Sequence, residues 1–240
     1  MENKKILGLI PARAGSVGVP GKNVRLLMGK PVISYSIDTA RESKFIDKIS
    51  VSSDDAKVME LCKALDDVVF VNRPEELASN SSRVDDAMRH CLRCLKEEHG
   101  YEPDIVVLLY ANIPVRSDTI IDRAIEKLIE TDADSVQSFT DPGKFHPYWL
   151  YQLENDGAAN KYIPNKIYRR QELPSLYAVD GAVAVIKTSV LLDAKGNDNP
   201  HAFFGTKRRA VIQQPHETVD IDSQLDFYLA EAVLRAKENK

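Results

Sequence analysis

This 240-residue chain has few cysteines, no excess of basic residues and no long apolar run, and each of these features excludes a class of protein. Three cysteines are too few for a disulfide framework. No apolar run approaches the roughly 20 residues of a membrane helix, and the first residues lead into a predicted strand rather than a signal peptide. Lysine and arginine number 32 against 36 acidic residues, which leaves no basic excess for a general nucleic-acid surface. We therefore predict a cytoplasmic protein with no nucleic-acid and no membrane partner.

Cys91 and Cys94 form a Cys-x-x-Cys pair, a pattern found in redox and metal sites. Both lie in a helical apolar pattern with Leu92 and Leu95, so helix packing is favoured over either chemical role. The sequence has no second pair of this kind, which counts against a zinc site.

Apolar segments of two kinds alternate along the chain, and a hydrophobic content of 43% suits one large α/β domain or one domain with an elaboration. Short continuous apolar runs predict strands at Ile6–Ile10, Lys48–Ser52, Val68–Val71, Ile105–Tyr110, Ser135–Phe139, Gly181–Ile186 and Ala210–Ile212. Helical patterns occur at Val32–Glu42, Ala56–Ala64, Val84–Glu98, Asp118–Glu130 and Gln224–Lys237. The alternation predicts a doubly wound, mostly parallel sheet of the Rossmann-like type, in which ligands lie at the carboxyl ends of strands.

One segment, residues 142–174, breaks this alternation. It contains weakly alternating residues at Tyr148–Leu153, a turn signal at Asn155–Gly157, and the only tryptophan, Trp149. We predict a β-rich arm inserted into an α/β domain formed by residues 1–141 and 175–240. The arm is interpreted as a dimerisation arm, a substrate lid or both, with a plain surface loop as the alternative.

A glycine-rich loop follows the first predicted strand, between Leu9 and Asn23. Gly15, Gly18 and Gly21 allow the backbone to curl and present N–H groups to an anion, and Arg13 and Lys22 add positive charge. The Walker pattern is excluded because Asn23 follows Lys22, and the dinucleotide pattern is excluded because the glycines are three apart. The loop predicts a polyphosphate site, against the alternative of an ordinary strand-to-helix turn.

Two carboxylates lie two residues apart in Val219–Ser223. If this stretch is extended, Asp220 and Asp222 project to one face and can share a hard cation such as Mg²⁺. The alternative is a helix N-cap, a role that suits Asp222 or Ser223. The phosphate loop favours the metal interpretation.

Two further segments carry arginine. Tyr168–Pro174 holds adjacent arginines that can clamp a carboxylate, although a solvated charged loop is the alternative. Arg73 follows a predicted strand end and can meet a base or a phosphate. Ser53–Asp55 also follows a strand end, but a helix cap explains it equally well.

Taken together, these segments resemble the acylneuraminate cytidylyltransferases, the enzymes that make CMP-sialic acid and related CMP-nonulosonates. The resemblance begins at Ile10-Pro-Ala-Arg-Ala-Gly-Ser-Val-Gly-Val-Pro-Gly-Lys-Asn23 and continues in family order through Lys30-Pro31, Val51–Asp55, Arg73–Ala78, Pro114–Arg116, Ala133–Val136, Arg170–Pro174, Asp180–Ala182 and Asp220–Asp222. The family that activates the eight-carbon sugar acid Kdo shares the arginine and the Pro-Gly-Lys of the first loop and is less similar afterwards.

The resemblance implies that CTP lies over the first loop and that the anomeric hydroxyl of a 2-keto-3-deoxy sugar acid attacks the α-phosphate, releasing pyrophosphate. The implied catalytic residues are Arg13, Lys22, Asp220 and Asp222, with Mg²⁺ as the cofactor on Asp220 and Asp222. The implied nucleotide-binding residues are Ala12, Ala14, Gly15, Ser16, Asn23, Arg73, Ser81 and Ser82. The implied sugar-binding residues are Tyr110, Asn112, Arg116, Arg170, Gln171 and Asp180. Arg170 and Gln171 would come from the partner subunit of a homodimer, or of a tetramer.

The chain departs from the family pattern near the implied substrates. Val17 stands where the family has a lysine, Tyr110 where it has a glutamine, Asn112 where it has a threonine, and Asp180 where it has an asparagine. These changes indicate a sugar acid other than ordinary N-acetylneuraminate, such as its deaminated analogue or a legionaminate-type acid. The alternatives are a nucleotidyltransferase for another acid such as Kdo and a catalytically inactive relative that binds nucleotide-sugar.

Overall fold

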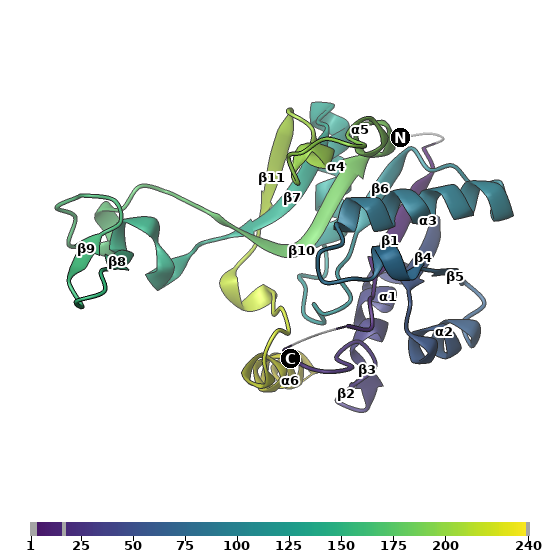
Figure 1. Cartoon of the computed structure of the whole chain (residues 1–240), viewed down its shortest axis with the longest axis horizontal. Coiled ribbons are helices and arrows are strands. Elements are labelled where there is room, and N and C mark those ends of the chain that lie inside the picture. Colours follow the sequence, from purple (N-terminus) through teal and green to yellow (C-terminus); the bar gives the residue numbers. More distant parts are fainter. Residues whose placement is uncertain (1–3, 16–17, 239–240) are drawn as a thin grey trace.

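The computed structural model describes residues 4–15 and 18–238, and within them the chain forms a seven-stranded sheet with helices on both faces (Figure 1). The strand order is β11-β7-β10-β6-β1-β4-β5. β10 runs antiparallel to both of its neighbours, and the other paired strands run parallel. The predicted α/β fold with a mostly parallel sheet is confirmed. The strands are β1 (Ile6–Pro11), β4 (Lys48–Ser53), β5 (Val68–Asn72), β6 (Ile105–Leu108), β7 (Ser135–Thr140), β10 (Ala178–Lys187) and β11 (Arg208–Ile212).

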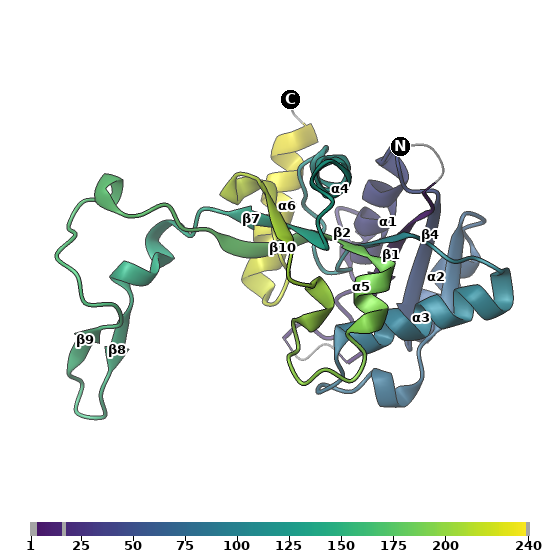
Figure 2. The ribbon, with the colours of Figure 1, turned by 90° about the horizontal axis from the view of Figure 1, so that it is seen from above.

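The buried residues of β1 alternate between the two faces of the sheet. Ile6 and Ile10 pack with α1 (Val32–Glu42), α2 (Ala56–Lys63) and α4 (Ile120–Thr131). On the other face, Leu7 and Leu9 pack with α3 (Val84–His99) and with α5 (Thr188–Asp193), a short helix that the sequence did not predict. Figure 2 shows α1 and α4 on one side of the sheet and α3 and α5 on the other. Both faces are therefore covered, which explains why the strands are continuously apolar.

The ends of two helices follow from local chemistry. The Asp55 side chain caps α2 by accepting a hydrogen bond from the Lys57 amide at 2.8 Å. Gly100 ends α3 in the left-handed conformation, with φ of 59°. In the middle of α3, Cys91 is fully buried, and burial raises the pKa of its thiol to about 12. Cys91 and Cys94 are both free thiols on a packed helix, as the packing interpretation predicts.

The C-terminal helix α6 (Gln224–Glu238) brings the end of the chain back to the glycine loop. Phe227 and Ala230 of α6 pack in one cluster with Val19 and Leu27, beside the small antiparallel pair β2 (Leu26–Leu27) and β3 (Lys30–Pro31). The approach is so close that a Cβ atom on Gly18 would collide with the carbonyl oxygen of Asp222. Residues 18 and 222, far apart in the sequence, thus face one another.

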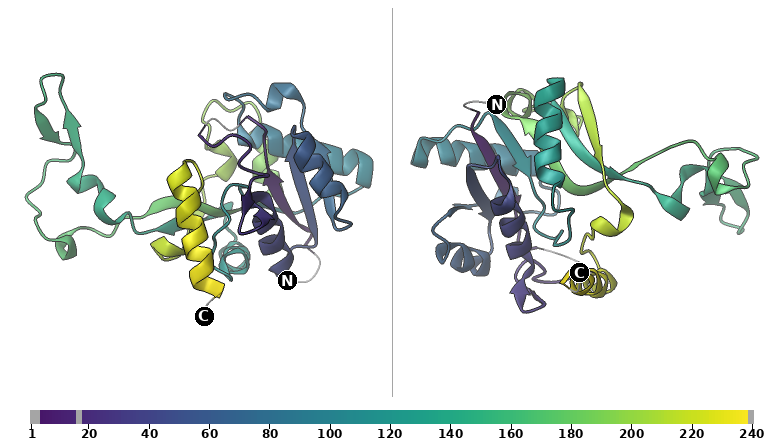
Figure 3. Two further views of the ribbon diagram at one scale, coloured as in Figure 1. Left: turned by 90° about the horizontal axis from the view of Figure 1, so that it is seen from below. Right: turned by 180° about the vertical axis from the view of Figure 1, so that it is seen from behind.

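The chain between β7 and β10 leaves the body of the molecule and returns (Figure 3). Its far part holds the antiparallel pair β8 (Tyr151–Leu153) and β9 (Ala159–Lys161). The turn predicted at Asn155–Gly157 joins these two strands, and Gly157 adopts a φ of 89° there. Most residues of both strands are exposed.

Among the described residues, no helix has the length and apolar character needed to span a bilayer.

Candidate active site

A cavity of about 360 Å³ opens beside the carboxyl ends of β1 and β5. Parallel strands place their carboxyl ends at one edge of a sheet, so the loops that follow them meet there. The lining residues combine three arginines, a lysine, a carboxylate and amide or hydroxyl groups: Pro11, Arg13, Gly18, Lys22, Asn23, Arg73, Leu77, Ser82, Arg83, Val84, Tyr110, Asn112 and Asp222. Six of the catalytic and nucleotide-binding residues predicted from the sequence therefore line one cavity.

The first part of the glycine loop is held from both sides. Arg13 donates from Nη1 to the Asn80 side chain at 2.6 Å and to the Ser79 carbonyl at 3.2 Å. The amide of Ala14 donates to Asp54 at 2.8 Å, and the Asn23 side chain donates to the Arg13 carbonyl at 3.0 Å. These bonds within the chain fix the shape of the loop.

The other predicted loop residues within the described part of the chain differ in their surroundings. Ala12 is buried, and its carbonyl accepts a hydrogen bond from the Ser53 hydroxyl. Gly15 is exposed next to Arg13. Ser16, together with the divergent Val17, lies outside the described residues.

Lys22 links the glycine loop to the C-terminal carboxylates. Its ammonium donates to the Asp222 carboxylate and to the Ile221 carbonyl, both at 2.8 Å. Its side chain is 14% exposed, whereas that of Asp222 is 75% exposed. The largely buried ammonium of Lys22 thus pairs with the exposed carboxylate of Asp222. An anionic ligand could replace that carboxylate as the partner of the ammonium.

Asp222 is free of the capping role that the sequence left open. Ser223 and Asp226 cap α6 instead: the Asp226 carboxylate accepts from the Ser223 amide at 2.7 Å, and the Ser223 hydroxyl lies 3.4 Å from the Asp226 amide. The Asp222 carboxylate takes no part in this exchange and remains beside Lys22.

Asp220 is exposed, as Asp222 is, and its carboxylate is held by an amide. Asn112 donates from Nδ2 to the Asp220 carboxylate. The surrounding protein on one side and the charge of Asp222 raise the pKa of Asp220 to about 6, while Lys22 opposes the shift. A cation placed here would relieve the repulsion between the two carboxylates.

These oxygens fit a magnesium ion that takes its remaining ligands from phosphate and water. Asp220, Asp222 and the amide of Asn112 present hard oxygen donors of the kind that Mg²⁺ prefers. Among the described residues, no group of three or more His, Cys, Asp or Glu side chains could hold a metal ion. Two carboxylates without a full protein cage are typical of magnesium at nucleotide sites.

Arg73 forms the floor of the cavity beside β4. Its side chain is buried and donates from Nη2 to the Ser52 carbonyl at 2.7 Å and from Nε to the Ser52 hydroxyl at 3.2 Å. Burial lowers the pKa of the guanidinium. Ser82 lines the same cavity, whereas Ser81 is exposed and hydrogen-bonds to Ser79.

Of the residues predicted to bind the sugar, Arg116 is buried and Asp180 is half-buried, and neither lines the cavity described above or the cavity that adjoins it. Arg116 is buried and donates to the carbonyls of Ala182 and Tyr110 at 2.6 and 2.8 Å, and burial lowers its pKa to about 9. Asp180 accepts from the Ser138 hydroxyl and from the Gln213 side chain at 2.8 Å. Both groups hold the segment Tyr110–Arg116 and strand β10 in place.

Arg170 and Gln171 lie in the arm, in a different cavity of about 220 Å³ that also contains His146. Arg170 is 64% exposed, and its Nη2 lies 3.5 Å from Asp141. In a single copy of the chain, these two side chains are not brought together with Tyr110 and Asn112.

A second cavity, of about 540 Å³, adjoins the first. Among the described residues the two cavities share Arg83, Val84 and Tyr110. Its walls combine apolar and polar groups: Asp85, Gln137, Val179, Gly181, Val183, Ala184, Pro200, His201, Phe203, Phe204 and Arg208. The sequence interpretation did not identify this wall, because Phe203 and Phe204 carry no motif and meet α3 only through the sheet topology.

Two smaller features were also missed. Asp54 follows a strand end and was explained as part of a helix cap, but it anchors the Ala14 amide, while its neighbour Asp55 provides the cap. Asn80 lies in the serine-rich segment before α3 and holds Arg13. The available signal was the strand-end position for Asp54 and the serine-rich segment after Ala78 for Asn80.

Comparison with known proteins gives consistent matches over nearly the whole chain. Residues 7–235 match the family described as Cytidylyltransferase. The chain is 32% identical over 245 residues to the N-acylneuraminate cytidylyltransferase of Streptococcus agalactiae serotype V, an alignment that covers 98% of the chain and 56% of that protein. The chain thus spans a little over half the length of this relative.

Two further matches cover both partners fully. The chain is 27% identical over 238 residues to the CMP-N,N'-diacetyllegionaminic acid synthase of Legionella pneumophila, covering 98% of each. A solved structure of CMP:2-keto-3-deoxy-manno-octonic acid synthetase complexed with CTP has a TM-score of 0.71 at 17% identity and covers 98% of this chain and 99% of that one. This structural likeness extends to the fold.

Proposed function

The chain belongs to the cytidylyltransferase family, and on that premise we propose that it transfers the cytidylyl group of CTP to the anomeric hydroxyl of a nonulosonic acid, releasing pyrophosphate. The observation that carries the proposal is the convergence of Arg13, Lys22 and Arg73 on one cavity that also contains Asp222. Three cations at the carboxyl edge of a parallel sheet suit the charge of a triphosphate.

The reaction forms a bond from the anomeric oxygen to the α-phosphorus and breaks the bond from that phosphorus to the oxygen that leaves with pyrophosphate. Such transfers depend on positioning and on charge neutralisation more than on covalent chemistry. Arg13 is held by Asn80 and Lys22 by the Ile221 carbonyl, so their charges are oriented before the phosphates arrive.

Asp220 and Asp222 would hold Mg²⁺, which when bound would neutralise charge on the phosphates. Lys22 forms an ion pair with Asp222. We expect the triphosphate to draw the Lys22 ammonium toward its oxygens, which would leave the Asp222 carboxylate available as a ligand.

The second cavity is the proposed site of the sugar acid. Arg83 and Arg208 supply positive charge, and Phe203 and Phe204 supply an apolar wall that acyl groups could cover. Tyr110 stands between the two cavities in the place of the family glutamine. The apolar wall supports an acylated, legionaminate-type acid as the acceptor. A synthase of a diacetylated legionaminic acid is among the relatives.

We further propose that the working enzyme is a homodimer in which the arm of one subunit completes the site of the other. Arg170 and Gln171 are exposed on an arm that stands away from the body of its own chain (Figure 1). A partner's arm would bring Arg170 to the acid carboxylate, which its guanidinium matches bidentately. Because CTP is a cytoplasmic metabolite, we place the reaction in the cytoplasm.

The test is pyrophosphate release with Mg²⁺ and CTP across N-acetylneuraminate, its deaminated analogue, legionaminate, pseudaminate and Kdo. We expect release with a nine-carbon acid and none when UTP or ATP replaces CTP. Release of pyrophosphate with Kdo alone would show that the acceptor is an eight-carbon acid. If every acid is inert while CTP still binds in calorimetry, the chain is a nucleotide-binding relative without this activity.

A further inference from the structure

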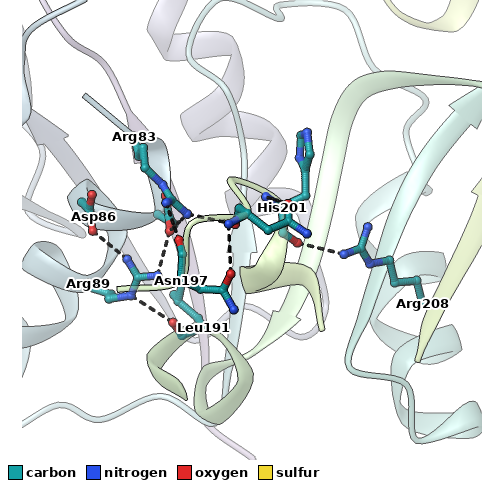
Figure 4. Close-up of polar contacts among 9 residues, drawn as sticks. Arg83, Asp86, Arg89, Leu191, Asn197, His201 and Arg208 are labelled. Carbon is teal, nitrogen blue, oxygen red and sulfur yellow. Dashed lines mark hydrogen bonds and ion pairs between the residues drawn. The ribbon is translucent and has the colours of Figure 1, made fainter. Parts of the chain in front are cut away.

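Arg83 is a charged residue that lines both cavities. It is the N-cap residue of α3, so its backbone is fixed where the segment that carries Ser82 meets the first turn of the helix. The sequence interpretation gave it no role. Figure 4 shows its guanidinium pointing away from the helix axis toward the segment that contains Asn197.

One side of the Arg83 guanidinium is anchored on a buried carboxylate. Nε and Nη2 donate to the two oxygens of Asp85, each at 3.0 Å, in a bidentate pair. Asp85 is 1% exposed and also receives a hydrogen bond from Arg89 at 2.7 Å. Arg89 in turn donates to Asp86 at 2.8 Å, so the first turn of α3 forms one ionic network.

The other side of the guanidinium holds what we call the wall loop, residues 197–205. Nη1 donates to the Asn197 carbonyl at 2.7 Å, and Nη2 donates to the Asn199 carbonyl at 3.3 Å. The wall loop carries His201, Phe203 and Phe204, which form one wall of the second cavity. Arg83 therefore fastens this wall to the N-terminus of α3.

A second arginine closes the far end of the wall loop. Arg208 donates from Nη2 to the His201 carbonyl and from Nε to the Gly205 carbonyl, both at 2.8 Å (Figure 4 shows the first contact). The loop is thus fixed at both ends by charge-assisted bonds to its backbone, which do not depend on its side chains. Of the two arginines, Arg83 reaches the loop from the nucleotide cavity.

We infer that Arg83 is a positioning residue that sets the wall of the acceptor cavity from the nucleotide side and so governs affinity for the sugar acid. The inference rests on the proposed function for the identity of the acceptor. Without the guanidinium, the Asn197 and Asn199 carbonyls would hydrogen-bond to water instead. Phe203 and Phe204 would then no longer be held at a fixed position relative to α3. The effect should fall on the acceptor, because Arg13, Lys22 and Arg73 are held by other groups.

The kinetic test compares Arg83→Met, Arg83→Lys and Arg93→Gln with the wild type. We expect Arg83→Met to raise the KM for the acid about tenfold and to change the KM for CTP by less than about threefold. Arg83→Lys should recover part of the loss, because an ammonium can hold one carbonyl but cannot also form the bidentate pair with Asp85. Arg93→Gln is the control, since Arg93 is an exposed arginine of the same helix that lines neither cavity, and it should leave the acid KM near the wild-type value.

Hydrogen exchange gives a readout that does not depend on turnover. In Arg83→Met, we expect faster amide exchange in residues 197–205 and unchanged exchange in residues 73–79. Unchanged exchange in the wall loop, or an equal rise in the KM values for acid and CTP, would overturn the inference. If the wild type uses none of the acids, the proposed function fails, and the exchange result still decides whether Arg83 holds the wall.

Discussion

The cavity edge of the sheet and the arm both carry arginines assigned to ligand binding, yet the chain holds them in opposite ways. Arg73 is 6% exposed and is hydrogen-bonded to the end of β4. Arg170 is 64% exposed, and the ion pair found for it is a 3.5 Å contact to Asp141. The side chains at the cavity edge are therefore held by contacts within one chain, whereas Arg170 on the arm makes few contacts within its own chain.

The contrast has a structural cause. At the cavity edge, parallel strands bring several loops together over a covered sheet, so donors and acceptors find partners within the chain. The arm contains two strands of three residues each, and an isolated pair of this size is marginally stable in water. It also exposes large apolar side chains, among them Leu153 at 70% and Tyr168 at 90%. We therefore expect the nucleotide site to survive in a monomer and the arm to require a second surface.

The largest effect should come from Asp222→Ala at the cavity edge. Loss of this carboxylate removes one of the two proposed magnesium ligands, and we expect turnover to fall by at least about a hundredfold. Because the side chain is 75% exposed, the melting temperature should stay close to that of the wild type. Asp156→Ala, an exposed carboxylate in the arm, is the matched control and should retain activity. Normal turnover in Asp222→Ala would refute the metal assignment.

Arg116→Met should show how strongly the cavity edge depends on buried bonds. Its guanidinium is fully surrounded and donates to the carbonyls of Ala182 and Tyr110. Leaving those carbonyls unpaired should lower the free energy of unfolding by about 3 kcal/mol, measured by urea titration. Arg123→Met removes one bond, from an exposed arginine to the Ile212 carbonyl, and should cost much less. Equal losses in both variants would contradict the structural role given to Arg116.

Arg170→Ala tests the proposed role of the arm in binding the acid. We expect the KM for the acid to rise about tenfold with little change in stability, because the side chain makes few contacts within its own chain. Arg169→Ala, the neighbouring arginine, serves as the control.

Mixing two impaired variants tests whether the arm acts across the dimer. Asp222→Ala and Arg170→Ala chains, dissociated, reassembled together and assayed at an acid concentration below the wild-type KM, should recover up to about a quarter of wild-type activity, because half of the dimers would be mixed and each would hold one intact site. No recovery in the mixture would mean that each arm serves its own chain.

The smallest effect concerns pH and Asp220. Its folded pKa, about 6, lies above the unfolded value, so the folded state binds the proton more tightly. The stability of the wild type relative to Asp220→Asn should be greatest below about pH 4 and should fall as the pH rises through about 6. Melting temperatures of the ligand-free proteins between pH 4 and 8 check the sign. A difference that grows with pH would contradict the raised pKa.

Most of the fold could be predicted from the sequence, because strands that are buried on both faces are continuously apolar. Continuous apolar runs predicted the sheet strands, and the structure extends β10 and β11 by a few residues beyond those predictions. The short helix α5 was missed, since six residues carry too little periodicity to stand out.

Prediction of the candidate site was uneven for a different physical reason. Arg13, Lys22 and Arg73 could be named because glycines and strand ends mark them, and the structure gathers them around one cavity. Arg116 and Asp180 could not be distinguished from ligand-binding residues, because sequence spacing does not show whether a charged group points inward. Arg83 and the wall loop were missed because their contact joins residues more than 110 positions apart.

By itself, the sequence determined the chemistry available to this protein: an anion-binding loop, a pair of carboxylates and an α/β chain able to cover its sheet. Local patterns suffice for these features, because backbone freedom, charge and periodicity are properties of neighbouring residues. Which of these groups meet depends on the three-dimensional fold. It paired Lys22 with Asp222, buried Arg116, left Arg170 on the arm and placed Arg83 between two cavities. Those outcomes depend on the sheet order and on packing between distant segments, which no local pattern contains.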